Sequence, residues 1–117
     1  MNEDALMKLH RTLFRTCIEA GMLTKQNLAN GFNKPATKVY IQNDPATHDH
    51  PNVNVAFGND LEVCLSIDTG QVLAGNMAGE LLINTREWVI EHQIELLDIW
   101  FQIKNENRPK LLWVYDE

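Results

Sequence analysis

The sequence predicts one two-layer α+β domain, in which an antiparallel meander of three to five strands packs against one long C-terminal helix after an N-terminal pair of helices. Three observations lead to this prediction. Apolar residues recur every three or four positions near both ends of the chain, which is typical of amphipathic helices. Between these ends, apolar and polar residues alternate, as in half-buried strands. A length of 117 residues suits one domain over 1–117, with N-terminal helices in 1–33 and the remaining elements in 37–117.

The N-terminal part is expected to form two helices. Apolar residues between Leu6 and Cys17 are spaced by three or four positions, which predicts an amphipathic helix over 2–20. A shorter helix is expected over 25–30, where Thr24 can cap its first turn. This helix is too short and too poor in cations to read DNA as the second helix of a helix-turn-helix would.

The middle of the chain alternates in hydrophobicity and is expected to form strands. The predicted strands cover residues 37–43, 52–57, 61–67 and 71–74, and a last one covers 111–115. Turn sequences at 58–60 and 68–70 join three of them into a meander. The face of this sheet that the long helix leaves free is expected to be covered by the N-terminal helix.

The period returns to that of a helix over 84–105. Asn84 and Glu87 have the spacing of a capping box, so Asn84 is the predicted N-cap. The stripe expected to cover the sheet consists of Trp88, His92, Leu96, Ile99, Trp100 and Ile103. A lone histidine on such a stripe is expected to be a hydrogen-bonded core residue. Because a long apolar helix face needs a sheet to cover, the two layers follow.

Charge and composition narrow the classes of partner and compartment. The formal net charge is −6, and the ten lysines and arginines are scattered, which disfavours direct binding to nucleic acid. Cys17 and Cys64 lie in apolar surroundings and are expected to be free, buried thiols in a reducing compartment. The acidic start and the lack of an apolar run of about 20 residues predict a cytoplasmic protein without a membrane partner.

The sequence contains few residue patterns that could support catalysis or metal binding. His48, Asp49 and His50, with Asp44 nearby, are the candidates for a metal site, but they could converge only through the shape of the loop; a solvated turn is the simpler interpretation. The Asp-Thr-Gly sequence at 68–70 occurs in aspartic proteases and equally in ordinary turns. No nucleophile elbow, glycine-rich phosphate loop or cofactor fingerprint is present. We therefore predict no catalytic residues and no cofactor.

Two groups of residues are candidates for binding a partner. Glu91, Glu95 and Asp98 fall on the outward face of the long helix, where they could meet a basic protein. Trp113 and Tyr115 alternate with apolar residues on the last strand, and such aromatic residues often anchor interfaces. The aromatic residues could instead complete the core, and the edge strand could pair with a second copy to form a homodimer.

Three blocks between residues 38 and 100 resemble a family of small prokaryotic domains of unknown function. The blocks are Asp49-His50-Pro51 followed by Val53 and Val55; residues 67–75, Ile-Asp-Thr-Gly-Gln-Val-Leu-Ala-Gly; and Glu87-Trp88, His92 and Glu95-Leu96-Leu97 through Trp100. Together they cover about half of the chain. Asn52 and Asn54 stand where the family typically has histidines, which argues against a ligand site there. The resemblance implies a compact α+β fold and a setting among phages, mobile elements or toxin–antitoxin modules.

The leading functional hypothesis is a small, acidic, non-enzymatic binding protein. It would inhibit or neutralise a basic, nucleic-acid-handling protein, as an antitoxin or anti-CRISPR protein does. The alternatives are a metal-dependent hydrolase or toxin that uses the loop with His48 and His50, and a structural homodimer joined through the final strand.

Overall fold

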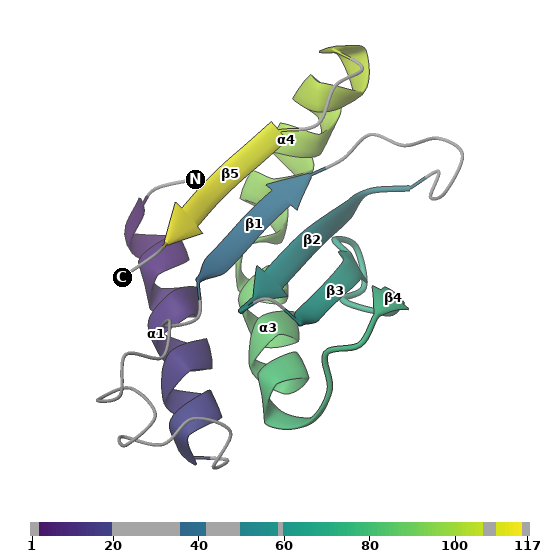
Figure 1. Ribbon diagram of the computed structural model, residues 1–117. Helices are drawn as coiled ribbons and strands as arrows, with labels where there is room; N and C mark the ends of the chain where they lie inside the picture. The colour runs from purple at the N-terminus through teal and green to yellow at the C-terminus, as the bar shows by residue number, and fades with distance from the viewer. Residues whose placement is uncertain (1–2, 20–35, 42–49, 59, 107–109, 116–117) are drawn as a thin grey trace.

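The computed structural model describes residues 3–19, 36–41, 50–58, 60–106 and 110–115, with residues 104–106 and 110–115 described as backbone. The elements are α1 (Glu3–Glu19), β1 (Thr37–Ile41), β2 (Asn52–Phe57), β3 (Leu61–Ser66), β4 (Val72–Gly75), α3 (Gly79–Glu91), α4 (Gln93–Glu106) and β5 (Lys110–Tyr115). All pairings in the five-stranded sheet are antiparallel, in the order β4-β3-β2-β1-β5. The predicted α+β fold with an antiparallel sheet is confirmed (Figure 1). The predicted helix over 25–30 lies outside the described residues.

Alternating residues give the sheet one apolar face. Val39, Val55 and Val63 lie opposite one another on β1, β2 and β3, and all three are fully buried. Because successive side chains point to opposite faces, the neighbours of these valines lie on the other face. Lys38 and Glu62 are two such neighbours, and both are exposed. The alternation therefore determines which face carries the core.

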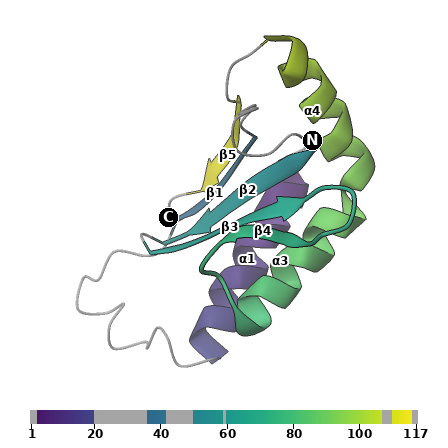
Figure 2. The same cartoon turned by 90° about the vertical axis from the view of Figure 1, so that its right-hand side faces the viewer.

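The described helices all pack on the same face of the sheet (Figure 2). The expectation that α1 covers the opposite face is wrong. A hydrogen bond of 2.6 Å joins the buried His10 Nδ1 of α1 to the Thr37 hydroxyl of β1. The Trp88 indole N–H of α3 donates to the Ala5 carbonyl of α1, at 2.8 Å. These bonds place α1 beside α3, where both bury apolar residues against the sheet.

The C-terminal helical segment begins earlier than the capping-box pattern predicts, and it is not one uninterrupted helix. α3 starts at Gly79 with Ala78 as its N-cap residue, so Asn84 lies inside the helix. The Asn84 amide donates instead to the Thr16 hydroxyl of α1 at 2.8 Å. The prediction of an N-cap at Asn84 is therefore wrong, because a tertiary contact takes up the side chain. His92 separates α3 from α4.

One apolar core lies between the helices and the sheet. Its buried members are Leu6, Leu9, Leu13, Cys17, Val39, Ile41, Val53, Val55, Phe57, Val63, Leu65, Ile67, Met77, Leu81, Trp88, Val89, Leu96, Ile99, Trp100 and Ile103. Cys17 and Cys64 are both buried and unpaired, as expected. Within the described ranges, every buried side-chain nitrogen or oxygen has a hydrogen-bond partner. No helix in those ranges is long and apolar enough to cross a bilayer.

Candidate functional site

The carboxylates predicted to bind a partner lie on the solvent side of the C-terminal helices. Glu91 ends α3, whereas Glu95 and Asp98 lie on α4, and all three are exposed. The Glu91 carboxylate is 3.8 Å from the Lys8 ammonium of α1. Both side chains of this pair are well exposed, so it stabilises the fold by about 1 kcal/mol or less. The predicted exposure of the three carboxylates is confirmed.

The break at His92 leaves the two helices joined by helical hydrogen bonds. His92 has φ −114° and ψ 23°, and its N–H donates to the carbonyls of Trp88 and Val89, each at 3.2 Å. The Leu96 N–H in turn donates to the His92 carbonyl at 3.0 Å. The His92 ring is partly buried, with its centroid 5.0 Å from that of Trp88 and its Nδ1 3.6 Å from a Glu95 oxygen. His92 is therefore a junction residue at the rim of the core.

A second apolar stripe runs along these helices on the side away from the sheet. We call it the outer stripe; it consists of Ile83, Ile90, Ile94 and Phe101, which are 47%, 44%, 85% and 56% exposed. When Glu87 and Leu97 are counted as well, the row comprises positions 83, 87, 90, 94, 97 and 101, which are separated alternately by four and three residues. Since a helix turns by about 100° per residue, this spacing keeps them on one side, opposite Trp88 and Leu96. Exposed apolar residues that gather in this way mark interaction surfaces.

The turn between β3 and β4 lies against one flank of the outer stripe. The Arg86 Nε–H donates to the Gly70 carbonyl at 2.9 Å. The Gln93 amide donates to the carbonyls of Ile67 and Asp68, at 3.0 and 2.7 Å. These bonds come from both helices and fix the turn beside Ile90, whose Cδ1 would lie 3.1 Å from a Cβ added at Gly70. The Asp-Thr-Gly sequence thus forms a structural turn that borders the stripe.

Carboxylates dominate the polar residues around the outer stripe. Residues 79–103 contain five of them, at Glu80, Glu87, Glu91, Glu95 and Asp98, and all are exposed. The same segment contains one arginine, Arg86, which is engaged with the turn. The surface therefore combines apolar area with negative charge, which suits a partner that is both apolar and basic.

For the aromatic residues predicted on the last strand, the structure describes the backbone of β5. Trp113 pairs with Val39 and Tyr115 with Thr37. The order of the sheet places β5 at an edge, as predicted for the terminal strand. The side chains of Trp113 and Tyr115 lie outside the described part, so their role in binding stays a prediction.

The histidine-rich loop is described only at its end. Asp44, His48 and Asp49 lie outside the described residues, and His50 is exposed. Among the described residues, no group of three or more histidines, cysteines or acidic residues could hold a metal ion. The metal hypothesis for this loop therefore gains no support from the described part of the chain.

The sheet face opposite the helices carries a small polar cluster. The Tyr40 hydroxyl donates to the Glu62 carboxylate, and the Lys38 ammonium lies 5.1 Å from the centre of the Tyr40 ring.

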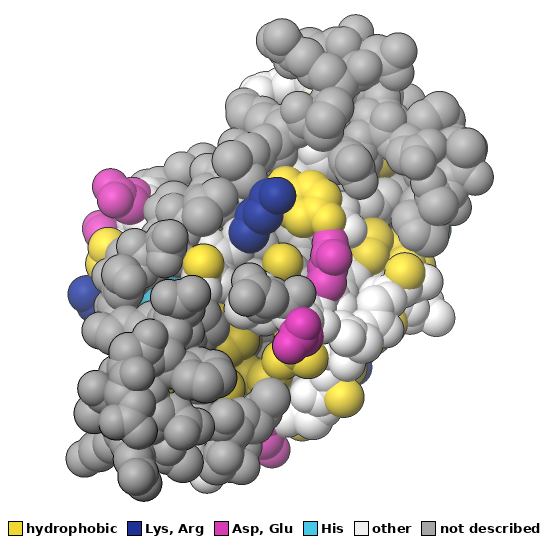
Figure 3. Space-filling model, viewed as in Figure 1, with side chains coloured by type: hydrophobic (Ala, Val, Ile, Leu, Met, Phe, Trp, Pro, Cys, Tyr) yellow, Lys and Arg dark blue, Asp and Glu magenta, His cyan; other side chains and the backbone are white. Residues whose placement is uncertain are grey.

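On the same face, the Cys64 thiol donates to the Asn52 side-chain oxygen at 3.5 Å. Burial, followed by the charge of Glu62, raises the pKa of Cys64 to about 11. The thiol therefore stays protonated and poorly nucleophilic near neutral pH. Figure 3 shows this side of the molecule, where apolar, basic and acidic side chains are interspersed.

Tyr40 provides a titration that tests this cluster. Burial, then the hydrogen bond to Glu62 and the charge of Glu62, raises the pKa of Tyr40 to about 12. We expect Glu62→Gln to lower this pKa toward the ordinary value of 10.0, because the variant removes the anion that disfavours phenolate. The measurement is an absorbance titration of phenolate in a Tyr115→Phe background, with Glu19→Gln as the control. An unchanged pKa in Glu62→Gln would show that Glu62 has no part in the shift.

The same pKa has a consequence for alkaline stability. Because the folded state favours the protonated phenol, the contribution of Tyr40 to stability is fully present below pH 10.0 and is lost as pH rises through about 12. Wild type is therefore expected to lose more stability over this interval than the Glu62→Gln variant does.

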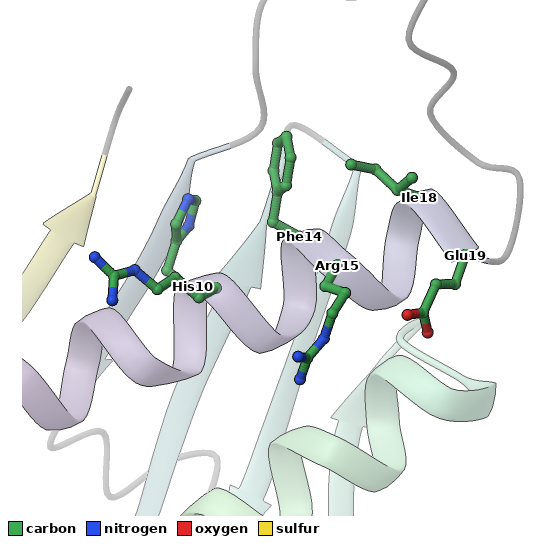
Figure 4. A pocket seen from close by; sticks show the side chains of 6 residues that line it. His10, Phe14, Arg15, Ile18 and Glu19 are labelled. Carbon is green, nitrogen blue, oxygen red and sulfur yellow. The ribbon is translucent and has the colours of Figure 1, made fainter.

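Several hollows line α1, and one of them reaches Glu80 and Asn84 of α3. One of about 350 Å³ is lined by His10, Arg11, Phe14, Arg15, Ile18 and Glu19. In Figure 4, Phe14 and Ile18 project from one side of α1, and Arg15 and Glu19 from the other. The charged and apolar side chains diverge, so this hollow offers no convergent binding groups.

Comparisons with protein-family models, with curated proteins and with solved structures find no match for this chain. The structural features of the chain itself therefore carry the functional inference. The outer stripe was not predicted from the sequence, because the stripe that contains the tryptophans already accounts for an apolar helix face. The signal that could have revealed it is the second spacing of three and four residues, from Ile83 to Phe101.

Proposed function

We propose that this chain is a non-enzymatic binding protein that holds a basic protein partner on the outward face of α3 and α4. The observation that carries the proposal is that exposed apolar residues such as Ile94 stand next to the exposed carboxylates Glu95 and Asp98 on the solvent side of α4. An apolar centre supplies most of the affinity of an interface, whereas charges at its rim supply attraction and selectivity. The net charge of −6 favours a basic partner over nucleic acid.

The class of partner is inferred from the negative charge of the chain together with the genetic setting of the family that it resembles. Proteins that handle nucleic acid carry basic surfaces to contact phosphates. An acidic domain that occupies such a surface inhibits or neutralises the protein, as an antitoxin or anti-CRISPR protein does. The resemblance of residues 38–100 to a prokaryotic domain family supports a phage, mobile-element or toxin–antitoxin setting.

Neutralising two rim carboxylates tests the proposal. The protein that the wild-type chain captures from a host lysate is identified and purified, and its affinity is measured at low and high salt. For the double variant Glu95→Gln, Asp98→Asn, we expect affinity at low salt to fall between about twofold and thirtyfold, from about 0.2–1 kcal/mol for each exposed charge. The difference should shrink at high salt, because ions screen exposed charges.

The matched control changes the same net charge elsewhere. Glu19→Gln with Asp60→Asn removes two exposed carboxylates, one at the end of α1 and one at the turn between β2 and β3. This control is expected to bind almost as wild type does. Equal loss in both double variants would mean that net charge alone drives binding, and no loss in either would contradict the proposed face.

A further inference from the structure

We propose that the outer stripe is a docking site for an amphipathic, basic α-helix of the partner. This inference deepens the proposed function and rests on it. Ile83, Ile90, Ile94 and Phe101 form a narrow apolar row, whereas a broad flat partner would require a wider patch. Ile83 and Phe101 are separated by 18 residue steps along α3 and α4, or about 27 Å at 1.5 Å per residue. A partner helix of about five turns matches that length.

The spacing of the row is the one that paired helices use. Alternating separations of three and four residues keep a seam of side chains facing a neighbouring helix, as in coiled coils. A helical ligand with apolar residues at the same spacing could place its side chains between those of the outer stripe. The separations average about 3.6 residues, the period of an α-helix, so the row presents one line of side chains that a facing helix can follow and an extended strand cannot.

The negative charge around the row favours a positively charged ligand. Glu91, Glu95 and Asp98 are exposed near it, and Glu87 lies within the spacing of the row itself. No described residue forms an ion pair with Glu87. A lysine or arginine on the facing helix would pair with Glu87 and so fix the register, as single polar seam positions do in coiled coils. The occupant is thus expected to carry apolar residues on one side and cations at its flanks.

Charge complementarity distinguishes this ligand from two other occupants. In a homodimer with antiparallel helices, equivalent flanks face each other, so carboxylates would meet carboxylates. An anionic membrane surface would be repelled by the same carboxylates. A basic helix is attracted by them and covers the apolar row at the same time.

The test uses the full chain and synthetic helical peptides of 21 residues as probes. The first peptide has leucine at alternating three- and four-residue spacing and lysine at the flanking positions. The second has the same composition in an order that spreads leucine around the helix, and the third has glutamate in place of lysine. Binding is measured by fluorescence anisotropy, and helix formation by circular dichroism. We expect the first peptide to bind at least tenfold more tightly than the others and to become helical.

Variants on the chain show where the peptide binds. Ile94→Gln with Phe101→Gln is expected to weaken binding of the first peptide at least tenfold, and both side chains are exposed enough for the fold to tolerate the changes. Val72→Thr is the control, because Val72 is 40% exposed on the edge strand β4 rather than on the helices. Circular dichroism and thermal unfolding confirm that each variant folds.

Each result decides between the occupants. Equal binding of the first and second peptides, or unchanged binding to Ile94→Gln with Phe101→Gln, overturns the helix proposal. Sedimentation that shows a dimer of the free chain, abolished in that variant, overturns it in favour of a second copy. If the peptides do not bind, but the double variant Glu95→Gln, Asp98→Asn still binds the natural partner more weakly than wild type does, the proposed function stands without the helical ligand. If neither response is seen, both fail.

Discussion

Replacing Trp88 by alanine is expected to lower the free energy of unfolding by about 3–5 kcal/mol. Trp88 is only 4% exposed, and it belongs to the core formed by the helices and the sheet. Its indole N–H also donates to the Ala5 carbonyl at 2.8 Å, which links α3 to α1. A domain of this size has a total stability of about 5–15 kcal/mol, so the loss is a large part of it. Urea unfolding followed by circular dichroism measures the change.

Trp88→Phe separates packing from the hydrogen bond. Phenylalanine keeps an aromatic ring in the core but has no N–H to donate to Ala5. The cost of this variant is expected to be smaller than that of Trp88→Ala. If Trp88→Ala cost less than about 1 kcal/mol, the contact between α1 and α3 would not be part of the core.

Gly75→Ala is expected to cost about 3 kcal/mol or more, because both backbone conformation and space forbid a side chain there. Gly75 has φ +113°, and a Cβ on it would lie 2.3 Å from the Glu62 carbonyl oxygen and 2.7 Å from Val63 Cα. These are backbone atoms of the neighbouring strand β3, so they can give way only if β4 moves off the sheet. Amide hydrogen exchange should therefore become faster along β3 and β4.

Gly79→Ala is the control for the backbone part of that effect. Gly79 also has a positive φ, +64°, but no atom lies within 4 Å of a Cβ built there. Its substitution is expected to cost about 1–2 kcal/mol, from the left-handed conformation alone. Equal costs at the two glycines would show that the close approach of β3 to Gly75 is absent.

Periodicity was sufficient to predict most of the elements. The strand predicted over 52–57 matches β2, because three valine and phenylalanine positions alternate with polar or small ones on a half-buried surface. The start of the C-terminal helices was not predictable in the same way. Asparagine is a residue type typical of N-caps, but only the folded chain brings Thr16 within hydrogen-bonding distance of Asn84. A local pattern was overridden by a contact between residues far apart in sequence.

The side of the sheet on which α1 packs could not be deduced from the pattern either. Alternation tells which residues share a face, whereas the placement of a helix depends on the chain that connects it. Asn52 is buried beside Cys64 on the face that the helices leave uncovered, which would not be expected from the polarity of an asparagine alone. Their mutual hydrogen bond makes that burial tolerable.

The candidate interface was half predictable. The exposure of Glu91, Glu95 and Asp98 was predicted from the helical period, because these residues fall outside the predicted core stripe. Leu97 falls in the row of the outer stripe by its spacing, yet it is partly buried against the core, so hydropathy alone does not separate core from surface here. The exposure of Ile94, at 85%, emerges only once the helices are placed on the sheet.

Hydrogen–deuterium exchange of the full chain, with and without the leucine–lysine peptide, tests most directly whether the outward face of α3 and α4 is the binding surface. We predict new protection confined to the segment from Ile83 to Phe101 and lost in the Ile94→Gln, Phe101→Gln variant. Protection that appears instead along β5 or α1, or that persists unchanged in the variant, would contradict this assignment.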